Sequence, residues 1–199
     1  MAQTESGYDS RRYALINRWN PRNLHLIRDW VRPKPNAHVL DVGCGRGHLV
    51  GALRDLGVDA EGIDLNPNAA EVAIVPHVQT MSATELQFES NTFDAVVSFH
   101  AIEHIPDVDA ALAEMARVVK PSGSVLLVYP AEPIRGLFAI PTAVILHRNP
   151  LRAREVHIHK LNPRVVGVKV AAVGLRAVRN QFRPWPSPEW ATLCGSADS

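Results

Sequence analysis

Three glycines at alternate positions follow an acidic residue in the pattern Asp41-x-Gly43-x-Gly45-x-Gly47. A short apolar run precedes the pattern and predicts a buried parallel strand, and leucines at helical spacing follow it. A glycine turn between a strand and a helix is typical of nucleotide sites in α/β folds, because the backbone takes special dihedral angles there and the ligand approaches it closely. The negative charge of Asp41 would repel a pyrophosphate, so the turn favours a ligand that carries a positive charge at this place.

The pattern resembles the first motif of the class I S-adenosylmethionine-dependent methyltransferases. The nicotinamide fingerprint Gly-x-Gly-x-x-Gly fits worse, because its third glycine would fall on His48 or on Val50. The resemblance implies S-adenosylmethionine as the methyl donor, with S-adenosylhomocysteine as the product. It also implies the α/β Rossmann-like fold of this class, with a doubly wound, mostly parallel sheet. Cys44 lies inside the turn, where we expect it to serve as a small residue next to the cofactor.

A second carboxylate, Asp64, ends the next expected strand, Asp59–Asp64. It lies roughly 20 residues beyond the glycine turn, where an α/β nucleotide site places the acid that binds the ribose. A carboxylate can accept hydrogen bonds from both ribose hydroxyls. We therefore expect Asp64, with Leu65 beside it, to bind the cofactor. The competing interpretation is that Asp64 caps the following helix.

The loop that begins at Ser82 is expected to face the adenine ring. In the resembled family this loop often opens with an acidic residue that binds the adenine amino group. Ser82 stands at this place and can accept only a weaker hydrogen bond, whereas the backbone amide of Ala83 can still contact the ring. Phe99, the last residue of the fourth expected strand, completes the expected cofactor contacts.

Three ionisable side chains, His100, Glu103 and His104, follow directly after the fourth expected strand. Ligand sites of open α/β sheets lie at this end of the strands. On a helical turn the two histidines would share a face, with Glu103 adjacent to both. Methyl transfer requires an acceptor held in line with the methyl group, exclusion of water and, for some acceptors, a base.

These three residues leave three interpretations open. His100 or His104 is a general base oriented by Glu103. Alternatively, the three hold a divalent cation for a catecholic acceptor, as in the ubiquinone-pathway O-methyltransferases, whose pattern here is Glu-x-x-Glu-His. Because His100 replaces the first glutamate, this set suits magnesium badly, and we predict no metal. In the third interpretation, Glu103 and His104 tie the loop to the methionine end of the cofactor, since this pair recurs in members with unlike substrates.

The elements that position these residues are expected to form one domain over residues 8–183, with tails at 1–7 and 184–199. The length of 199 residues is enough for one domain with a sizeable core but hardly for two. The family closes its sheet with a seventh, antiparallel strand, which only Trp190–Cys194 could supply. Three prolines make the approach to this segment irregular, so we predict a short or missing seventh strand. These prolines are Pro184, Pro186 and Pro188.

Residues 130–161 depart from the alternation of strands and helices. The segment Ile134–His147 is apolar and is predicted to be helical, and arginines and histidines follow it. In this fold an insertion after strand five usually forms part of the acceptor pocket, so we expect a substrate cap. Contact with a membrane surface and extra core packing are the alternatives. A helical pattern from Tyr8 to Val31, broken at Pro21, fits either a cover over the cofactor or part of the core.

Composition and charge restrict the partners. The formal net charge is +1, which gives no general attraction to nucleic acid. Two cysteines are too few for a disulfide framework or a cysteine-only zinc site. The polar N-terminus and the absence of a long apolar run predict a cytoplasmic protein without an integral membrane segment. The oligomeric state stays open.

The sequence therefore predicts a methyltransferase that moves a methyl group to an O, N or C atom of a small or medium-sized acceptor. The composition of the cap favours a partly hydrophobic acceptor, such as a natural product, a quinone or a lipid-linked molecule. The alternative is a non-catalytic protein of the same fold that binds the cofactor or a partner. A nicotinamide oxidoreductase is the remaining rival.

Overall fold

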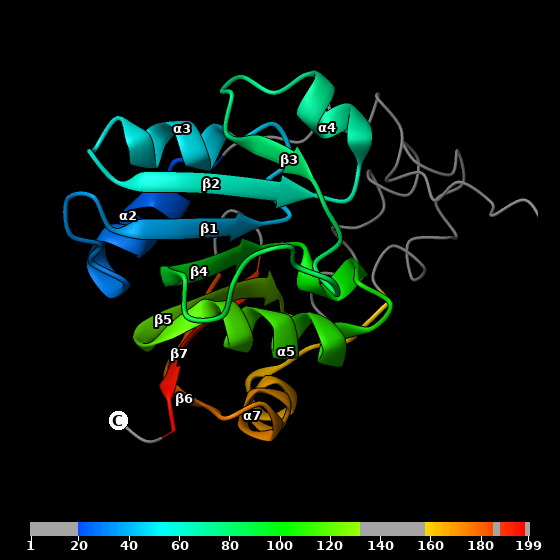
Figure 1. Cartoon of the computed structure of the whole chain (residues 1–199). Helices are drawn as coiled ribbons and strands as arrows, with labels where there is room; N and C mark the ends of the chain where they lie inside the picture. The colour runs from blue at the N-terminus through cyan, green and yellow to red at the C-terminus, as the bar shows by residue number, and fades with distance from the viewer. Residues whose placement is uncertain (1–19, 132–157, 185–187, 198–199) are drawn as a thin grey trace, which may run out of the picture.

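The computed structural model describes residues 20–131, 158–184 and 188–197, and within these ranges seven strands form one mixed sheet (Figure 1). The strands lie in the order β3-β2-β1-β4-β5-β7-β6. The strands are β1 (His38–Val42), β2 (Asp59–Asp64), β3 (Val78–Thr80), β4 (Phe93–Phe99), β5 (Val119–Pro130), β6 (Leu175–Arg183) and β7 (Glu189–Ser196). The helices are α2 (Arg22–Trp30), α3 (His48–Arg54), α4 (Pro67–Glu71), α5 (Val108–Val118) and α7 (Pro163–Ala172), with a short 3-10 helix η2 (Ile102–His104).

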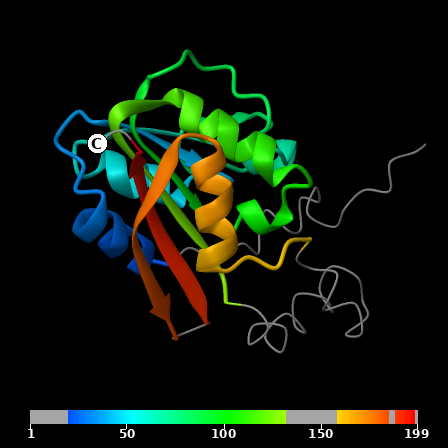
Figure 2. The same cartoon turned by 90° about the horizontal axis from the view of Figure 1, so that it is seen from below.

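Helices cover both faces of the sheet, because successive side chains of a strand point to opposite sides. In β1, Leu40 and Val42 pack into the apolar cluster that contains residues of α5 and α7. Val39, which directly precedes Leu40, packs into the cluster that contains residues of α2 and α3. Figure 2 shows α7 beside the hairpin of β6 and β7. The central strands are buried on both faces, which explains their nearly continuous apolar sequences.

The carboxyl ends of five parallel strands meet at one edge of the sheet, since β3 also pairs in parallel with β2. β1 pairs in parallel with β2 and β4, and β4 pairs in parallel with β5. Their arrowheads point to the right in Figure 1. The chain passes from β1 to β2 on one side and returns to β4 on the other side, so the order of strands reverses between β1 and β4. This reversal confirms the expected doubly wound, Rossmann-like sheet and creates the crevice where such sheets bind ligands.

The prediction of a short or missing seventh strand was wrong. β7 runs over eight residues, Glu189–Ser196, and pairs antiparallel with both β5 and β6. The prolines do not oppose this strand because they precede its first residue, so none removes a ladder donor from it. Pro188 instead accepts a hydrogen bond from the amide of Ala131 at 3.0 Å, which aligns the start of β7 with the end of β5.

Two segments that the sequence analysis singled out fall outside the described residues. They are the first part of the N-terminal helical pattern, up to residue 19, and most of the expected cap, residues 132–157. Within the described ranges, no helix combines the length and the apolar character needed to cross a membrane.

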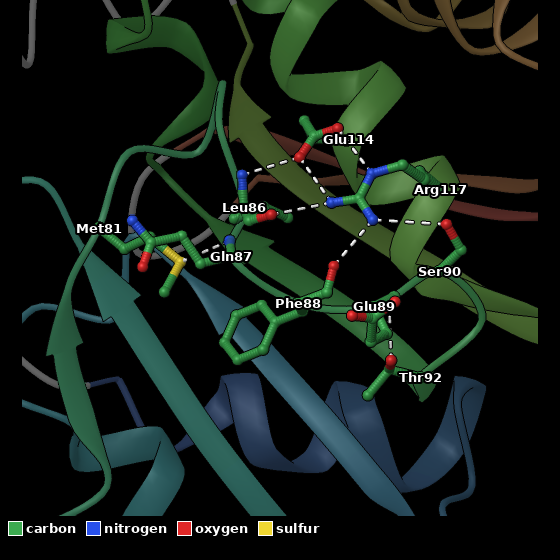
Figure 3. Close-up of polar contacts among 9 residues, drawn as sticks. All are labelled: Met81, Leu86, Gln87, Phe88, Glu89, Ser90, Thr92, Glu114 and Arg117. Carbon is green, nitrogen blue, oxygen red and sulfur yellow. Dashed lines mark hydrogen bonds and ion pairs between the residues drawn. The ribbon is translucent and has the colours of Figure 1, made fainter.

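The loop between β3 and β4 is held by one arginine of α5 (Figure 3). The Arg117 guanidinium donates hydrogen bonds to the carbonyls of Leu86 and Phe88 at 2.9 and 2.8 Å, and to both carboxylate oxygens of Glu114 at 2.8 Å. The Leu86 amide in turn donates to Glu114 at 2.8 Å. The hydrogen bond from Arg117 lowers the pKa of the Glu114 carboxyl. The planar fork of an arginine suits this arrangement, since it presents several donors in one plane.

We predict that Arg117→Ala lowers the free energy of unfolding by about 1–2 kcal/mol, because two loop carbonyls lose a charged donor that is partly exposed. Arg117→Lys keeps the charge but loses the planar fork of donors. Its free energy of unfolding is expected to lie between those of the alanine variant and the wild type. Urea denaturation of the three proteins checks this order. A lysine variant as stable as the wild type would contradict the role of the fork.

Candidate functional site

The glycine turn between β1 and α3 has a backbone that other residues could not easily adopt. Gly43, Gly45 and Gly47 have φ angles of +78°, +54° and +78°. A Cβ atom at Gly43 would overlap the Cβ of Ala101, and one at Gly47 would lie 2.5 Å from a methyl group of Val78. Glycine is therefore required at positions 43 and 47 for two reasons: the backbone is left-handed, and there is no space for a side chain.

Asp64, at the end of β2, is tied to the glycine turn. Its carboxylate accepts hydrogen bonds from the amide of Gly45 at 2.8 Å and from the amide of Asn66 at 2.9 Å. The N-cap of α4 is Asn66, whose side chain accepts from the amide of Asn68. Leu65 is 63% exposed at the same edge of the sheet. Asp64 therefore presents a fixed carboxylate beside the turn and does not serve as the cap of α4.

Asp41, in β1, is a buried carboxyl group, only 4% exposed. Burial, with a further contribution from the charge of Asp64, raises its pKa from 3.8 to about 8. Among the described residues no hydrogen bond to its side chain is found. The two carboxyl groups together make this corner of the sheet favourable for a positive charge.

Cys44 fills space behind the turn. Its thiol packs so closely on β2 that a Cβ atom at Gly62 would lie 2.6 Å from its sulfur atom. Burial, and then the negative charges of Asp41 and Asp64, raise the pKa of this thiol well above its usual range. A neutral, buried thiol is a weak nucleophile, so the side chain acts by its size.

The other expected cofactor residues lie on neighbouring loops of the same edge. The Ser82 hydroxyl lies 2.8 Å from the Thr84 hydroxyl and accepts a hydrogen bond from the Thr84 amide at 3.2 Å. Ala83 and Phe99 are partly buried, Ala83 against the α5 side of the core and Phe99 against the α2 side. The Ser82 side chain thus helps to fold its own loop.

The three ionisable residues after β4 are brought together. His100 has a left-handed φ of +55°, and its amide donates a hydrogen bond to the carbonyl of Val128 at 2.8 Å. The helix η2 then places the side chain of Glu103, 1% exposed, next to both histidines. A carboxylate oxygen of Glu103 lies 3.6 Å from Nδ1 of His100 and 3.8 Å from Nε2 of His104. These distances give electrostatic attraction rather than short hydrogen bonds.

The charge state of Glu103 follows from this environment. Burial alone would raise its pKa, but His100 and then His104 outweigh the burial and lower the pKa to about 2. Within the described part of the chain, both carboxylate oxygens are buried without a hydrogen bond. Glu103 is therefore a buried carboxylate that depends on neighbouring positive charge.

Two residues that the sequence analysis missed complete this cluster. Glu189, the first residue of β7, accepts a hydrogen bond from Nε2 of His100 at 2.6 Å. Its other carboxylate oxygen lies 2.9 Å from Nη1 of Arg183, the last residue of β6. His100 and Glu189 are 89 positions apart, and no local pattern connects them. The pairing of β5 with β7, which aligns Pro130 with Glu189, brings them together.

The last residues of the expected cap return to the same turn. The amides of Ile158 and His159 donate to the carbonyl of Glu103 at 3.0 and 3.2 Å. The His159 ring donates from Nε2 to the carbonyl of Ile105 at 2.9 Å. In the described ranges, no group of three or more histidine, cysteine or acidic side chains is arranged to hold a metal ion.

Comparisons with known proteins show which family this chain is similar to. Residues 8–191 match the family described as "Methyltransferase domain". The ubiquinone biosynthesis O-methyltransferase of Mesorhizobium japonicum is 27% identical over 153 residues, which are 67% of this chain and 60% of that protein. The enzyme of the same name from Xanthomonas campestris is 33% identical over 135 residues, or 57% of this chain and 56% of that protein. The chain thus spans a little over half the length of the curated relatives it matches.

The fold is also found in solved structures. The PH0226 protein of Pyrococcus horikoshii superimposes with a TM-score of 0.72 at 19% identity, over 98% of this chain and 100% of that chain. At this level of identity the likeness concerns the fold alone.

We predict different effects of alanine at two glycines with the same φ of +78°, Gly43 and Gly57. Gly57→Ala meets no atom within 4 Å and should destabilise the protein only through its backbone, by about 1 kcal/mol. Gly43→Ala must in addition displace Ala101 and should lower the free energy of unfolding clearly further. Denaturant unfolding of both variants measures the difference, and equal losses would contradict the close contact at Gly43.

The buried Asp41 predicts a pH dependence of stability. Folding raises the pKa of Asp41 from 3.8 to about 8. The contribution of the protonated Asp41 to the free energy of unfolding is therefore fully present below about pH 4 and is lost as the pH rises toward 8. Asp41→Asn removes this loss. The free energy of unfolding of the variant, relative to that of the wild type, should therefore rise by roughly 1 kcal/mol per pH unit between pH 5 and pH 8.

Urea denaturation of both proteins across this range gives the comparison. Glu103 does not interfere, since both its ordinary pKa of 4.5 and its value of about 2 in the folded protein lie below the range. A difference between the two proteins that does not change with pH would refute the burial of a titrating Asp41.

Proposed function

The chain belongs to the methyltransferase-domain family, and we propose that it transfers a methyl group from S-adenosylmethionine to an O, N or C atom of a small-molecule acceptor. The observation that carries the proposal is the glycine turn, in which Gly43 and Gly47 have no room for a side chain and Asp41 and Asp64 stand beside the backbone. Fold alone would be weak support, since one fold hosts many activities.

The residues of the turn fit S-adenosylmethionine. Its sulfur carries a positive charge and donates the methyl group when bound. Asp64 offers carboxylate oxygens for the ribose hydroxyls next to the amide of Gly45. The pKa of Asp41 is raised to about 8, and a cation nearby would favour the charged form of this carboxyl group. The Ser82–Ala83 loop offers a hydroxyl and a backbone amide for the adenine.

The residues after β4 have different roles in this proposal. Glu103 is a positioning residue, because its buried carboxylate faces both imidazoles. His104 is our candidate for taking up a proton from an acceptor that must lose one, since its Nε2 lies 3.8 Å from the carboxylate of Glu103, beyond hydrogen-bond distance. His100 is less suited to this task, because both of its ring nitrogens face carboxylates. The proposal involves no metal ion.

We propose a partly hydrophobic acceptor of small or medium size. Two arguments support it: the apolar sequence of residues 134–147 within the expected cap, and the names of the ubiquinone-biosynthesis relatives. The relatives extend beyond the matched region, so their acceptor need not be the acceptor of this chain. A purified protein that methylates only polar acceptors would refute this part of the proposal.

The second candidate is a protein of the same fold that binds the cofactor or a partner without catalysis. The dense charge pairing around His100 would fit a structural role as well. Formation of S-adenosylhomocysteine from S-adenosylmethionine in the presence of an acceptor separates the two candidates, because a non-catalytic protein would bind both molecules without converting one into the other.

We predict that the protein binds S-adenosylhomocysteine and that Asp64→Ala weakens this binding by about tenfold or more, the loss expected for hydrogen bonds to a charged group. Isothermal titration calorimetry measures both affinities. Asp59→Ala is the matched control, because Asp59 is an exposed aspartate at the opposite end of β2, paired with Arg54 at 2.9 Å. No binding by the wild type at high micromolar concentration would refute the cofactor, and unchanged affinity of the Asp64 variant would refute the ribose role.

A further inference from the structure

Four charged groups form a continuous row across the edge of the sheet, from β6 to η2. Arg183 contacts Glu189 at 2.9 Å, Glu189 contacts Nε2 of His100 at 2.6 Å, and Nδ1 of His100 faces Glu103 at 3.6 Å. His104 faces the same oxygen of Glu103 from the other side, at 3.8 Å. The row joins elements that are far apart in the sequence at the point where the proposed acceptor site begins.

The two carboxylates of this row are almost fully removed from water. The side chains of Glu189 and Glu103 are 4% and 1% exposed, and burying an unpaired charge is strongly unfavourable. The guanidinium of Arg183 can neutralise one of them. The other needs a second positive charge, and the His100 ring lies between the two carboxylates.

The ring nitrogens of His100 support this charge. A carboxylate can only accept hydrogen bonds, so the nitrogen 2.6 Å from Glu189 must carry a proton. The opposite nitrogen faces Glu103, which is ionised at neutral pH. A ring with a carboxylate at each nitrogen is most stable when both nitrogens are protonated. Among the described residues, the other charged groups of this row are Arg183 on β6 and His104 on η2, and each of them contacts one of the two carboxylates.

The backbone connects this ring to the glycine turn. His100 has a φ of +55°, a conformation that is strained for a residue other than glycine and that needs support from its surroundings. The next residue, Ala101, occupies the space that a side chain at Gly43 would need. A displacement of His100 would therefore move Ala101 against or away from the turn.

We propose that Glu189 is a positioning residue for methyl transfer, which holds His100 as an imidazolium between two carboxylates and so fixes Ala101 against the glycine turn. This inference rests on the proposed function. His100 then cannot accept a proton from the acceptor in its resting state, which separates its role from that of His104. Arg183 keeps the Glu189 carboxylate in place from the other side.

The test compares Glu189→Gln with a matched control, Glu61→Gln. Glu61 binds the ring of His38 at 2.7 Å in the same kind of pair, at the opposite end of the sheet. Glu189→Gln keeps the size of the side chain but removes its charge, and Glu189→Asp keeps the charge. Thermal unfolding of each variant shows that it is folded before the other measurements.

The first measurement is the protonation of His100 at neutral pH, from the nitrogen shifts of the histidine rings by NMR, with His100→Asn to assign the signal. We expect the imidazolium pattern in the wild type, in Glu61→Gln and in Glu189→Asp, and the neutral pattern in Glu189→Gln. A neutral His100 in the wild type, or an unchanged signal in Glu189→Gln, would overturn the inference.

The second measurement is the affinity for S-adenosylhomocysteine by calorimetry. Glu189→Gln should weaken binding several-fold, because Ala101 is no longer fixed against the turn, whereas Glu61→Gln should bind like the wild type. Equal binding by all three proteins would refute the positioning role and leave the proposed function intact. A wild type that binds no S-adenosylhomocysteine would instead refute the proposed function and the positioning role together.

Discussion

The burial of carboxyl groups at the carboxyl edge of the sheet is the constraint on which the rest of the structure depends. Asp41 stands in the middle of a parallel sheet whose neighbouring strands are apolar, and Asp64 adds a second carboxylate beside it. Such a pair is unfavourable without a positive charge nearby, and it stands beside a turn whose glycines pack closely against Ala101 and Val78. A cation would relieve this cost, because it favours the charged form of a buried carboxyl group.

Buried carboxylates are stabilised in a different way after β4. Around Glu103 and Glu189, the protein supplies its own positive charges from His100, His104 and Arg183. The two groups of carboxylates are joined through Ala101, which packs on Gly43 and follows His100 directly. The first group is available to a cationic ligand, which would favour the charged form of Asp41. The second group is neutralised internally and holds the backbone beside the first.

The part of this arrangement that could be predicted from sequence is the part encoded in short segments. The turn from Asp41 to Gly47 and the carboxylate of Asp64 follow from local spacing, because a strand, a tight turn and a helix need particular residues at particular positions. The fold could be predicted from the alternation of expected strands and helices along the chain. His100 and Glu103 could be placed at the sheet edge because they come directly after a strand.

What could not be predicted depends on pairing between distant strands. Glu189 reaches His100 only because β7 inserts between β5 and β6 in a register that aligns Glu189 with Pro130. The prolines before β7 led to the prediction of a short or missing strand. In the structure they precede the first residue of β7 and do not interrupt it. The hydrogen bonds from Arg117 to the loop after β3 could not be predicted either, since the acceptors are backbone carbonyl groups, which every sequence has.

A crystal structure of the protein with S-adenosylhomocysteine tests the central claim most directly. We predict that the ribose hydroxyls lie within hydrogen-bond distance of Asp64, that the amino-acid end lies over the glycine turn beside Asp41, and that the sulfur faces His100 and His104. A ligand bound elsewhere, or a glycine turn that must rearrange before the ligand fits, would contradict the account.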